Sequence, residues 1–111
     1  MDAENLTALV DHLLSSAREV PSGRSARTVH GGRTHALKQT VIALAGGRAL
    51  DDHESPGEAT LYVLRGRVVL TSGEDAWEGV AGDLVVIPDA RHRLDALADS
   101  AVLLTVVTAT P

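Results

Sequence analysis

The side chains best suited to chemistry in this chain are its five histidines: His12, His30, His35, His53 and His92. His53 and His92 stand out because each lies at the edge of a short apolar run that turn-forming residues border. Imidazole is the commonest protein ligand for Zn, Fe, Ni and Cu, so the pair is a candidate centre for a divalent transition metal. The alternative is that both are polar pocket residues, hydrogen-bonded to water or backbone.

Other site chemistries find little support in the sequence. Cysteine is absent, which excludes thiolate catalysis and Cys-based zinc sites. No glycine-rich phosphate loop has the required spacing, and no serine lies in a G-x-S-x-G elbow. Asp51 and Asp52 are adjacent, so in an extended chain their carboxylates point to opposite faces and do not form an acid–base pair.

Composition indicates a single globular domain. The 111 residues are 44% apolar and 23% charged, and no apolar run approaches the roughly 20 residues that span a bilayer. The net charge of −5 argues against nucleic acid, because phosphate binding needs clustered Lys and Arg. We therefore expect a cytoplasmic protein that binds neither nucleic acid nor membrane.

The charges are segregated along the chain. Residues 20–50 contain only basic charges, at Arg24, Arg27, Arg33, Lys38 and Arg48. Acidic residues follow at once, at Asp51, Asp52, Glu54 and Glu58. Two solvated faces account for this pattern, and so does a complementary contact between segments or between two copies of the chain.

The elements that must position these residues fall into two regions. Residues 2–18 have the helical period, with one apolar stripe and Asp2 or Asn5 as the cap. The rest of the domain or a partner subunit must cover that stripe. We assign 1–23 to this helix and its linker, and 24–111 to a β-domain.

The second region consists of short β-prone runs between turn signals. We predict strands at residues 38–45, 60–64, 68–71, 84–87 and 101–108, with Arg65-Gly66-Arg67 as a tight hairpin and His30 in a loop. We expect His35 to start the strand that continues through Leu37, Gln39 and Val41, which share its face. This spacing favours an all-β sandwich or barrel with one N-terminal α-helix.

Two segments in the second region resemble the motifs of a known family. Gly47, His53 and the run Tyr62-Val63-Leu64-Arg65-Gly66 resemble the first cupin motif, G-x5-H-x-H-x3-E-x6-G. The run from Gly82 to Pro88, followed by His92, resembles the second motif, shortened by one residue. The resemblance covers roughly residues 38–108 and implies a small, single-domain cupin: a jelly-roll β-barrel, usually dimeric.

The resemblance also implies a partial metal site. His53 and His92 match the first and last metal ligands of the family, whereas Ser55 and Ala59 stand where a second histidine and a glutamate belong. Glu58 is one residue early, so strand alternation points it to the opposite face. His35 is the best candidate for a third ligand, and Ser55, Gln39 and Tyr62 are the candidate ligand-binding residues.

Three functions remain open on this basis. The favoured one is a binding module for a small polar or anionic ligand, with a weakly held divalent transition metal at His53 and His92. The second is a metal-dependent cupin enzyme of the oxygenase or isomerase type, using His53, His92 and His35. The third is a homodimeric interaction domain without a ligand, which gains if bulky side chains fill the barrel.

Overall fold

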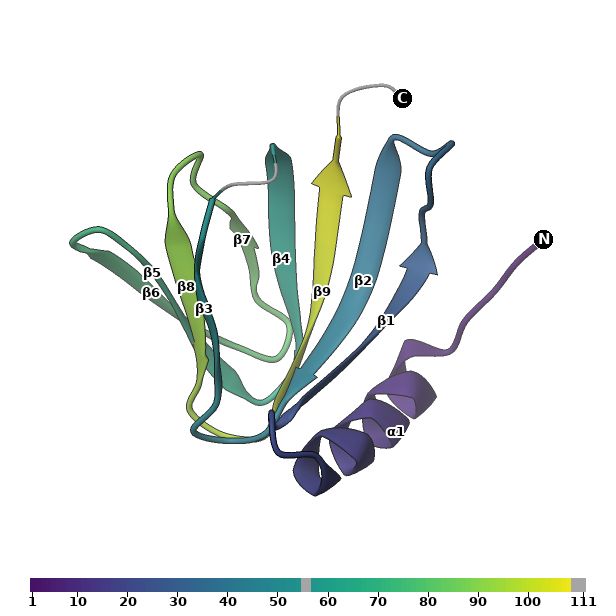
Figure 1. Ribbon diagram of the computed structural model, residues 1–111, viewed down its shortest axis with the longest axis horizontal. Coiled ribbons are helices and arrows are strands. Elements are labelled where there is room, and N and C mark those ends of the chain that lie inside the picture. The colour runs from purple at the N-terminus through teal and green to yellow at the C-terminus, as the bar shows by residue number, and fades with distance from the viewer. Residues whose placement is uncertain (55–56, 109–111) are drawn as a thin grey trace.

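The computed structural model describes residues 1–54 and 57–108, in which one helix precedes nine strands (Figure 1). The helix is α1 (Leu6–Glu19). The strands are β1 (Arg24–His30), β2 (Leu37–Leu44), β3 (Ala49–His53), β4 (Glu58–Arg65), β5 (Arg67–Ser72), β6 (Asp75–Val80), β7 (Leu84–Val86), β8 (His92–Ala96) and β9 (Ser100–Val107).

The strands form two antiparallel sheets that face each other across one core (Figure 1). The larger sheet has the order β1-β2-β9-β4-β7, and the smaller one has the order β3-β8-β5-β6. Alternate side chains of each strand point inward, such as Leu61 and Val63 on β4 and Val68 and Leu70 on β5. The prediction of an all-β barrel with one N-terminal helix is confirmed.

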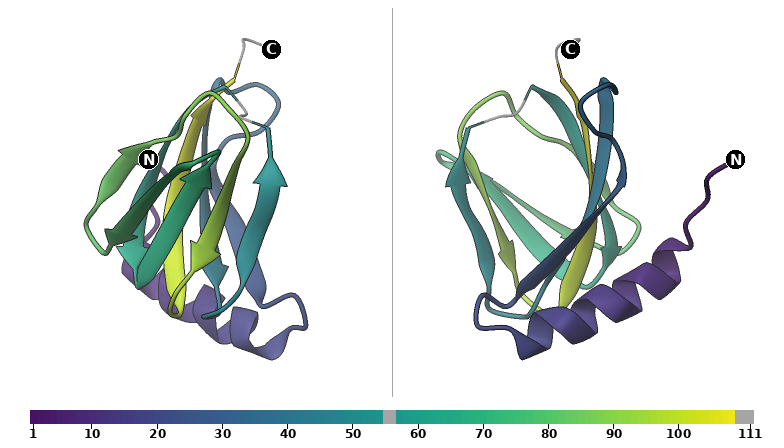
Figure 2. Two further views of the ribbon diagram at one scale, coloured as in Figure 1. Left: turned by 90° about the vertical axis from the view of Figure 1, so that its left-hand side faces the viewer. Right: turned by 45° about the vertical axis from the view of Figure 1, so that its right-hand side comes forward.

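Helix α1 covers part of the outer face of the larger sheet (Figure 2). It starts at Asn5, whose side chain accepts a hydrogen bond from the Ala8 amide at 2.9 Å. Its apolar stripe, which includes Val10 and Leu14, packs against Val41 of β2 and neighbouring residues. The chain therefore covers the stripe itself. No helix in the described part of the chain is long and apolar enough to cross a membrane.

Four strands lie outside the predicted runs: β1, β3, β6 and β8. β1 and β3 are edge strands, and most of their side chains are partly or fully exposed, so their sequences carry no apolar alternation. The prediction that His30 lies in a loop was wrong, because His30 is the last residue of β1 and pairs with Gln39.

Gly66 forms a corner between the sheets, not the predicted hairpin turn. β4 belongs to the larger sheet and β5 to the smaller one, and the two strands do not pair. Gly66 has a φ of +85°, and a Cβ there would collide with the Asp99 carbonyl and the Ser100 side chain. Ser100 in turn accepts a hydrogen bond from the Arg67 amide at 3.0 Å. A hairpin and a sheet-crossing corner both need a glycine at this position, so local sequence does not separate them.

Replacing Gly66 with alanine is expected to destabilise the fold strongly. The left-handed backbone and the overlap with the β8–β9 segment together cost roughly 2–5 kcal/mol in the free energy of unfolding. Urea denaturation of Gly66→Ala and of Gly73→Ala, whose added Cβ meets nothing within 4 Å, measures the difference. An equal loss in both variants would contradict the close approach at Gly66.

Asp99 ties the end of α1 to the turn between β8 and β9. Its Oδ1 accepts a hydrogen bond from the Gly46 amide at 2.8 Å, and its Oδ2 accepts one from Arg18 Nε at 2.6 Å. The Gly46 hydrogen bond, followed by that of Arg18, lowers the pKa of Asp99 below its ordinary value. The ionised carboxylate therefore favours the folded state.

Asp99→Asn is expected to lower the free energy of unfolding at neutral pH and to lower it by a smaller amount at acidic pH. A depressed pKa contributes stability that is complete above the unfolded value of about 4 and is lost as the pH falls through the lower folded value. Denaturation of both proteins between roughly pH 7 and pH 3 measures this convergence. A difference that stays constant over this range would contradict the proposed role of the charge.

Candidate functional site

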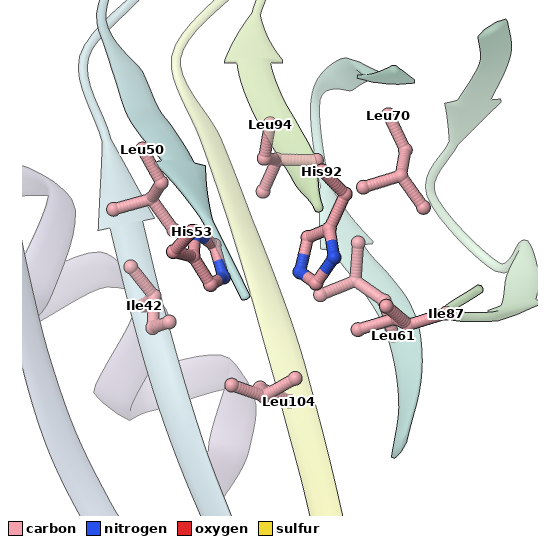
Figure 3. A pocket seen from close by; sticks show the side chains of 9 residues that line it. All are labelled: Ile42, Leu50, His53, Leu61, Leu70, Ile87, His92, Leu94 and Leu104. Atoms are coloured by element: carbon pink, nitrogen blue, oxygen red, sulfur yellow. The ribbon is translucent and has the colours of Figure 1, made fainter. Parts of the chain in front are cut away.

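The pairing of β3 with β8 places His53 directly opposite His92. The two imidazole rings have centroids 4.3 Å apart and an interplanar angle of 70° (Figure 3). The register shifts between Leu50 and His53, so that β3 has one extra residue at this point. Residues 50 and 53 would face opposite sides of a regular strand, but with this β-bulge both line the same interior cavity.

Backbone carbonyls orient both imidazoles. His53 Nδ1 lies 2.8 Å from the Asp51 carbonyl oxygen, and His92 Nδ1 lies 2.9 Å from that of Ala90. A carbonyl oxygen only accepts hydrogen bonds, so each Nδ1 carries the proton and donates it. In the neutral ring the lone pair is then left on Nε2. Figure 3 shows a nitrogen of each ring facing the gap between the rings.

The cavity around the two rings is small and apolar. Seven aliphatic side chains line it with the histidines: Ile42, Leu50, Leu61, Leu70, Ile87, Leu94 and Leu104 (Figure 3). The volume open to the centre of a water molecule is about 30 Å³, against the 10–15 Å³ that one buried water needs in this measure. His92 is buried and His53 is exposed, so His53 lies at the opening.

This arrangement can bind an electrophile or a hydrogen-bond donor. The two imidazole rings border a cavity with an apolar lining, and the low polarity of this lining strengthens electrostatic contacts made inside it. The two rings can ligate one metal ion or accept hydrogen bonds from one small molecule. In residues 1–54 and 57–108, no group of three or more His, Cys, Asp or Glu side chains could hold a metal ion.

The structure places His35 and Gln39 away from this cavity. Contrary to the prediction, His35 does not start a strand but lies between β1 and β2, with its ring centroid 4.9 Å from that of His30. Gln39 donates a hydrogen bond to Thr105 Oγ1 at 3.2 Å. It shares the outer face of β2 with Val41, which packs under α1. Neither residue therefore lies with His53 and His92.

Strand alternation also separates the other candidates on or near β4. Tyr62 is on the outer face and 37% exposed, while its neighbours Leu61 and Val63 point into the core. Ala59 is buried, and Glu58 is exposed, as the predicted parity requires. Ser55 lies outside the described residues.

The two arginines that flank His92 are engaged by carboxylates. Arg91 Nη1 lies 3.1 Å from Glu54. Arg93 Nε lies 3.1 Å from Asp95, and its Nη1 lies 3.4 Å from Asp51. The hydrogen bond with Asp95 and the charge of Asp95 raise the pKa of Arg93 above its ordinary value. These ion pairs neutralise the basic charge beside the opening.

Sequence reasoning missed the aliphatic wall and the two backbone acceptors. A signal for the wall exists, because Leu94 shares a strand face with His92, and Leu61 belongs to an inward row on β4. The carbonyls of Asp51 and Ala90 leave no signal in residue types. Only the bulge and the turn before β8 place them beside the rings.

Comparisons with known proteins agree with this fold. Residues 40–108 match a family model described as "Cupin domain". A conserved Streptococcus pyogenes protein of unknown function is 27% identical, with a TM-score of 0.73 over 83% of this chain and 80% of that chain. A protein from Thermus thermophilus is 20% identical, with a TM-score of 0.73 over 98% of this chain and 100% of that chain.

A cupin superfamily protein from Desulfitobacterium hafniense is 15% identical, with a TM-score of 0.71 over 78% of each chain. A likeness at this level of identity concerns the fold alone. The comparison with curated proteins found no match.

Proposed function

Because the chain belongs to the cupin domain family, we propose that its barrel is a binding module for a small polar or anionic ligand, held at His53 and His92 through one divalent transition-metal ion. One observation carries the proposal. Both Nδ1 atoms donate to backbone carbonyls, and this leaves two Nε2 lone pairs beside a cavity of limited size. Such backbone hydrogen bonds also fix the ring orientation of metal-ligating histidines.

The donor set fits a weakly held ion. Two neutral imidazoles suit Zn, Ni, Cu or Fe, and they leave coordination positions for a ligand from solution. A bound ion would supply a positive charge that attracts and polarises that ligand. A metal-dependent enzyme has less support, since no carboxylate in the described residues lines the cavity as a base or third ligand.

Untagged protein is expected to bind Ni²⁺ or Zn²⁺ at one site per chain, as measured by isothermal titration calorimetry. His53→Ala and His92→Ala should each weaken metal binding by at least roughly tenfold. Removing a group that hydrogen-bonds to a metal ligand already costs that much affinity, and removing the ligand itself costs no less. Unchanged affinity in both variants would overturn the proposal.

A matched control comes from the second histidine pair of the chain. His30 and His35 are also close together, with ring centroids 4.9 Å apart, but they lie outside the barrel. His35→Ala should bind the metal as tightly as the wild type. If His35→Ala alone abolishes binding, the metal belongs to the surface pair and the barrel is not a metal site.

A second proposal concerns the outer face of β4 and β7, which favours a homodimer. Leu84 and Val86 on β7 are 62% and 70% exposed, and Leu84 pairs directly with the exposed Tyr62. Contiguous exposed apolar side chains often mark an interaction site. The apolar stripe of α1 no longer argues for a partner, because the sheet covers it. Bulky aliphatic side chains also leave little space inside the barrel. This favours an interaction domain, because such a domain needs no ligand cavity.

Sedimentation velocity at micromolar concentration is expected to show a dimer for the wild type and a monomer for the double variant Leu84→Lys, Val86→Lys. Burying two added charges without partners in the interface is unfavourable. Leu97→Lys is the control, since Leu97 is 46% exposed in the β8–β9 turn and is not part of the β4–β7 pairing. A monomeric wild type would contradict the proposal.

A further inference from the structure

The basic stretch of residues 20–50 contains a cation that forms no ion pair with any carboxylate of the described residues. Arg27 on β1 pairs with Glu4 at 2.9 Å. Arg24, three residues earlier on the same strand, has no ion pair among the described residues, and its side chain is exposed. Because Arg24 is opposite Leu44 in the register and Leu44 belongs to the core, Arg24 points to the inner side of the larger sheet.

Arg24 lines a groove between the edge strands β1 and β3. The volume open to the centre of a water molecule is about 380 Å³, and the groove is open to solvent. Ser22 and Thr40 are polar residues of its lining, while Ile42 and Leu50 form an apolar part. The groove therefore combines a cation, hydrogen-bonding groups and an aliphatic surface.

The groove adjoins the histidine cavity. Ile42 and Leu50 line both spaces, so these two side chains separate the groove from the cavity that holds His53 and His92. Figure 3 shows both side chains beside the His53 ring. A ligand whose apolar end lies on Ile42 and Leu50 is thus next to the two imidazoles, while its polar end remains near Arg24.

We propose that this groove binds a small carboxylate with a short aliphatic chain. The carboxylate pairs with the Arg24 guanidinium, which suits bidentate contacts, and the chain packs on Ile42 and Leu50 toward the histidine pair. Arg91 and Arg93, which flank His92, already have carboxylate partners and are therefore poorer anion sites. The inference goes beyond the proposed function, because the groove is an additional site beside the His53–His92 cavity and Arg24, not the metal, holds the carboxylate.

Titration of sodium hexanoate into ¹⁵N-labelled, metal-free protein tests the groove directly. The amide signals of Ala26, Thr40 and Leu50 are expected to shift with increasing hexanoate, and hexan-1-ol should bind at least roughly tenfold more weakly because it lacks the charge. Arg24→Gln should weaken hexanoate binding by a similar factor. Arg27→Gln, on the outer face of the same strand, should bind hexanoate like the wild type.

Equal shifts with hexan-1-ol, or equal hexanoate affinity in Arg24→Gln and the wild type, would overturn the inference. The readout needs no metal, so it separates the two proposals. Hexanoate binding that depends on Arg24 supports the groove even if calorimetry detects no metal at His53 and His92. Metal binding without any hexanoate-induced shift in the groove leaves the histidine site intact and rejects this ligand class.

Discussion

The site depends on a bulge in β3, where Asp51 and Asp52 lie opposite the single residue Arg93 of β8. This extra residue turns His53 to the inner face that Leu50 also occupies. It also places the Asp51 carbonyl 2.8 Å from His53 Nδ1. Without it, alternation would point His53 to the outer face and leave His92 alone in an aliphatic cavity. One backbone irregularity thus sets both the position and the tautomer of the exposed imidazole.

Much of the fold follows from patterns that a strand or helix shows locally. The α1 stripe has the helical period, and the inward rows of β4, β5 and β9 are apolar because they build the core. β1 and β3 escaped prediction because edge strands exposed to solvent have no apolar row to reveal them. The polar side chains of β1 and β3 also leave these two edges of the barrel accessible to solvent.

The candidate site was predictable only in part. The motif positions identify His53 and His92. They do not show that the side chain of Tyr62 points to the outer face of the sheet. The run Leu61-Tyr62-Val63-Leu64 is apolar throughout because Leu61 and Val63 enter the core while Leu64 packs near α1 on the outside. Burial on both faces hides the alternation that would have assigned Tyr62 to the outer face.

The ion pairs explain why Arg24, and not the arginines beside His92, is the proposed anion site. Arg91 and Arg93 adjoin His92 in sequence, yet Glu54 and Asp51 of the acidic stretch and Asp95 of β8 neutralise them. Residues 20–50 have no acid of their own, and Arg27 reaches Glu4 only because β1 packs beside α1. Arg24 faces the other side of β1 and remains available. The charge segregation in the sequence therefore corresponds to two places in the fold. At the opening beside His53 and His92 the arginines are neutralised, and in the groove between β1 and β3 the Arg24 charge is not.

In the proposed site, both imidazoles present Nε2 to the barrel interior. Long-range ¹H–¹⁵N correlation of the histidine side chains shows which ring nitrogen carries the proton, in metal-free protein at roughly pH 8.5, where free imidazole is neutral. We predict a protonated Nδ1 and an unprotonated Nε2 for both His53 and His92. A protonated Nε2 on either ring would contradict this arrangement, because that ring could not offer a lone pair to a metal or ligand in the cavity.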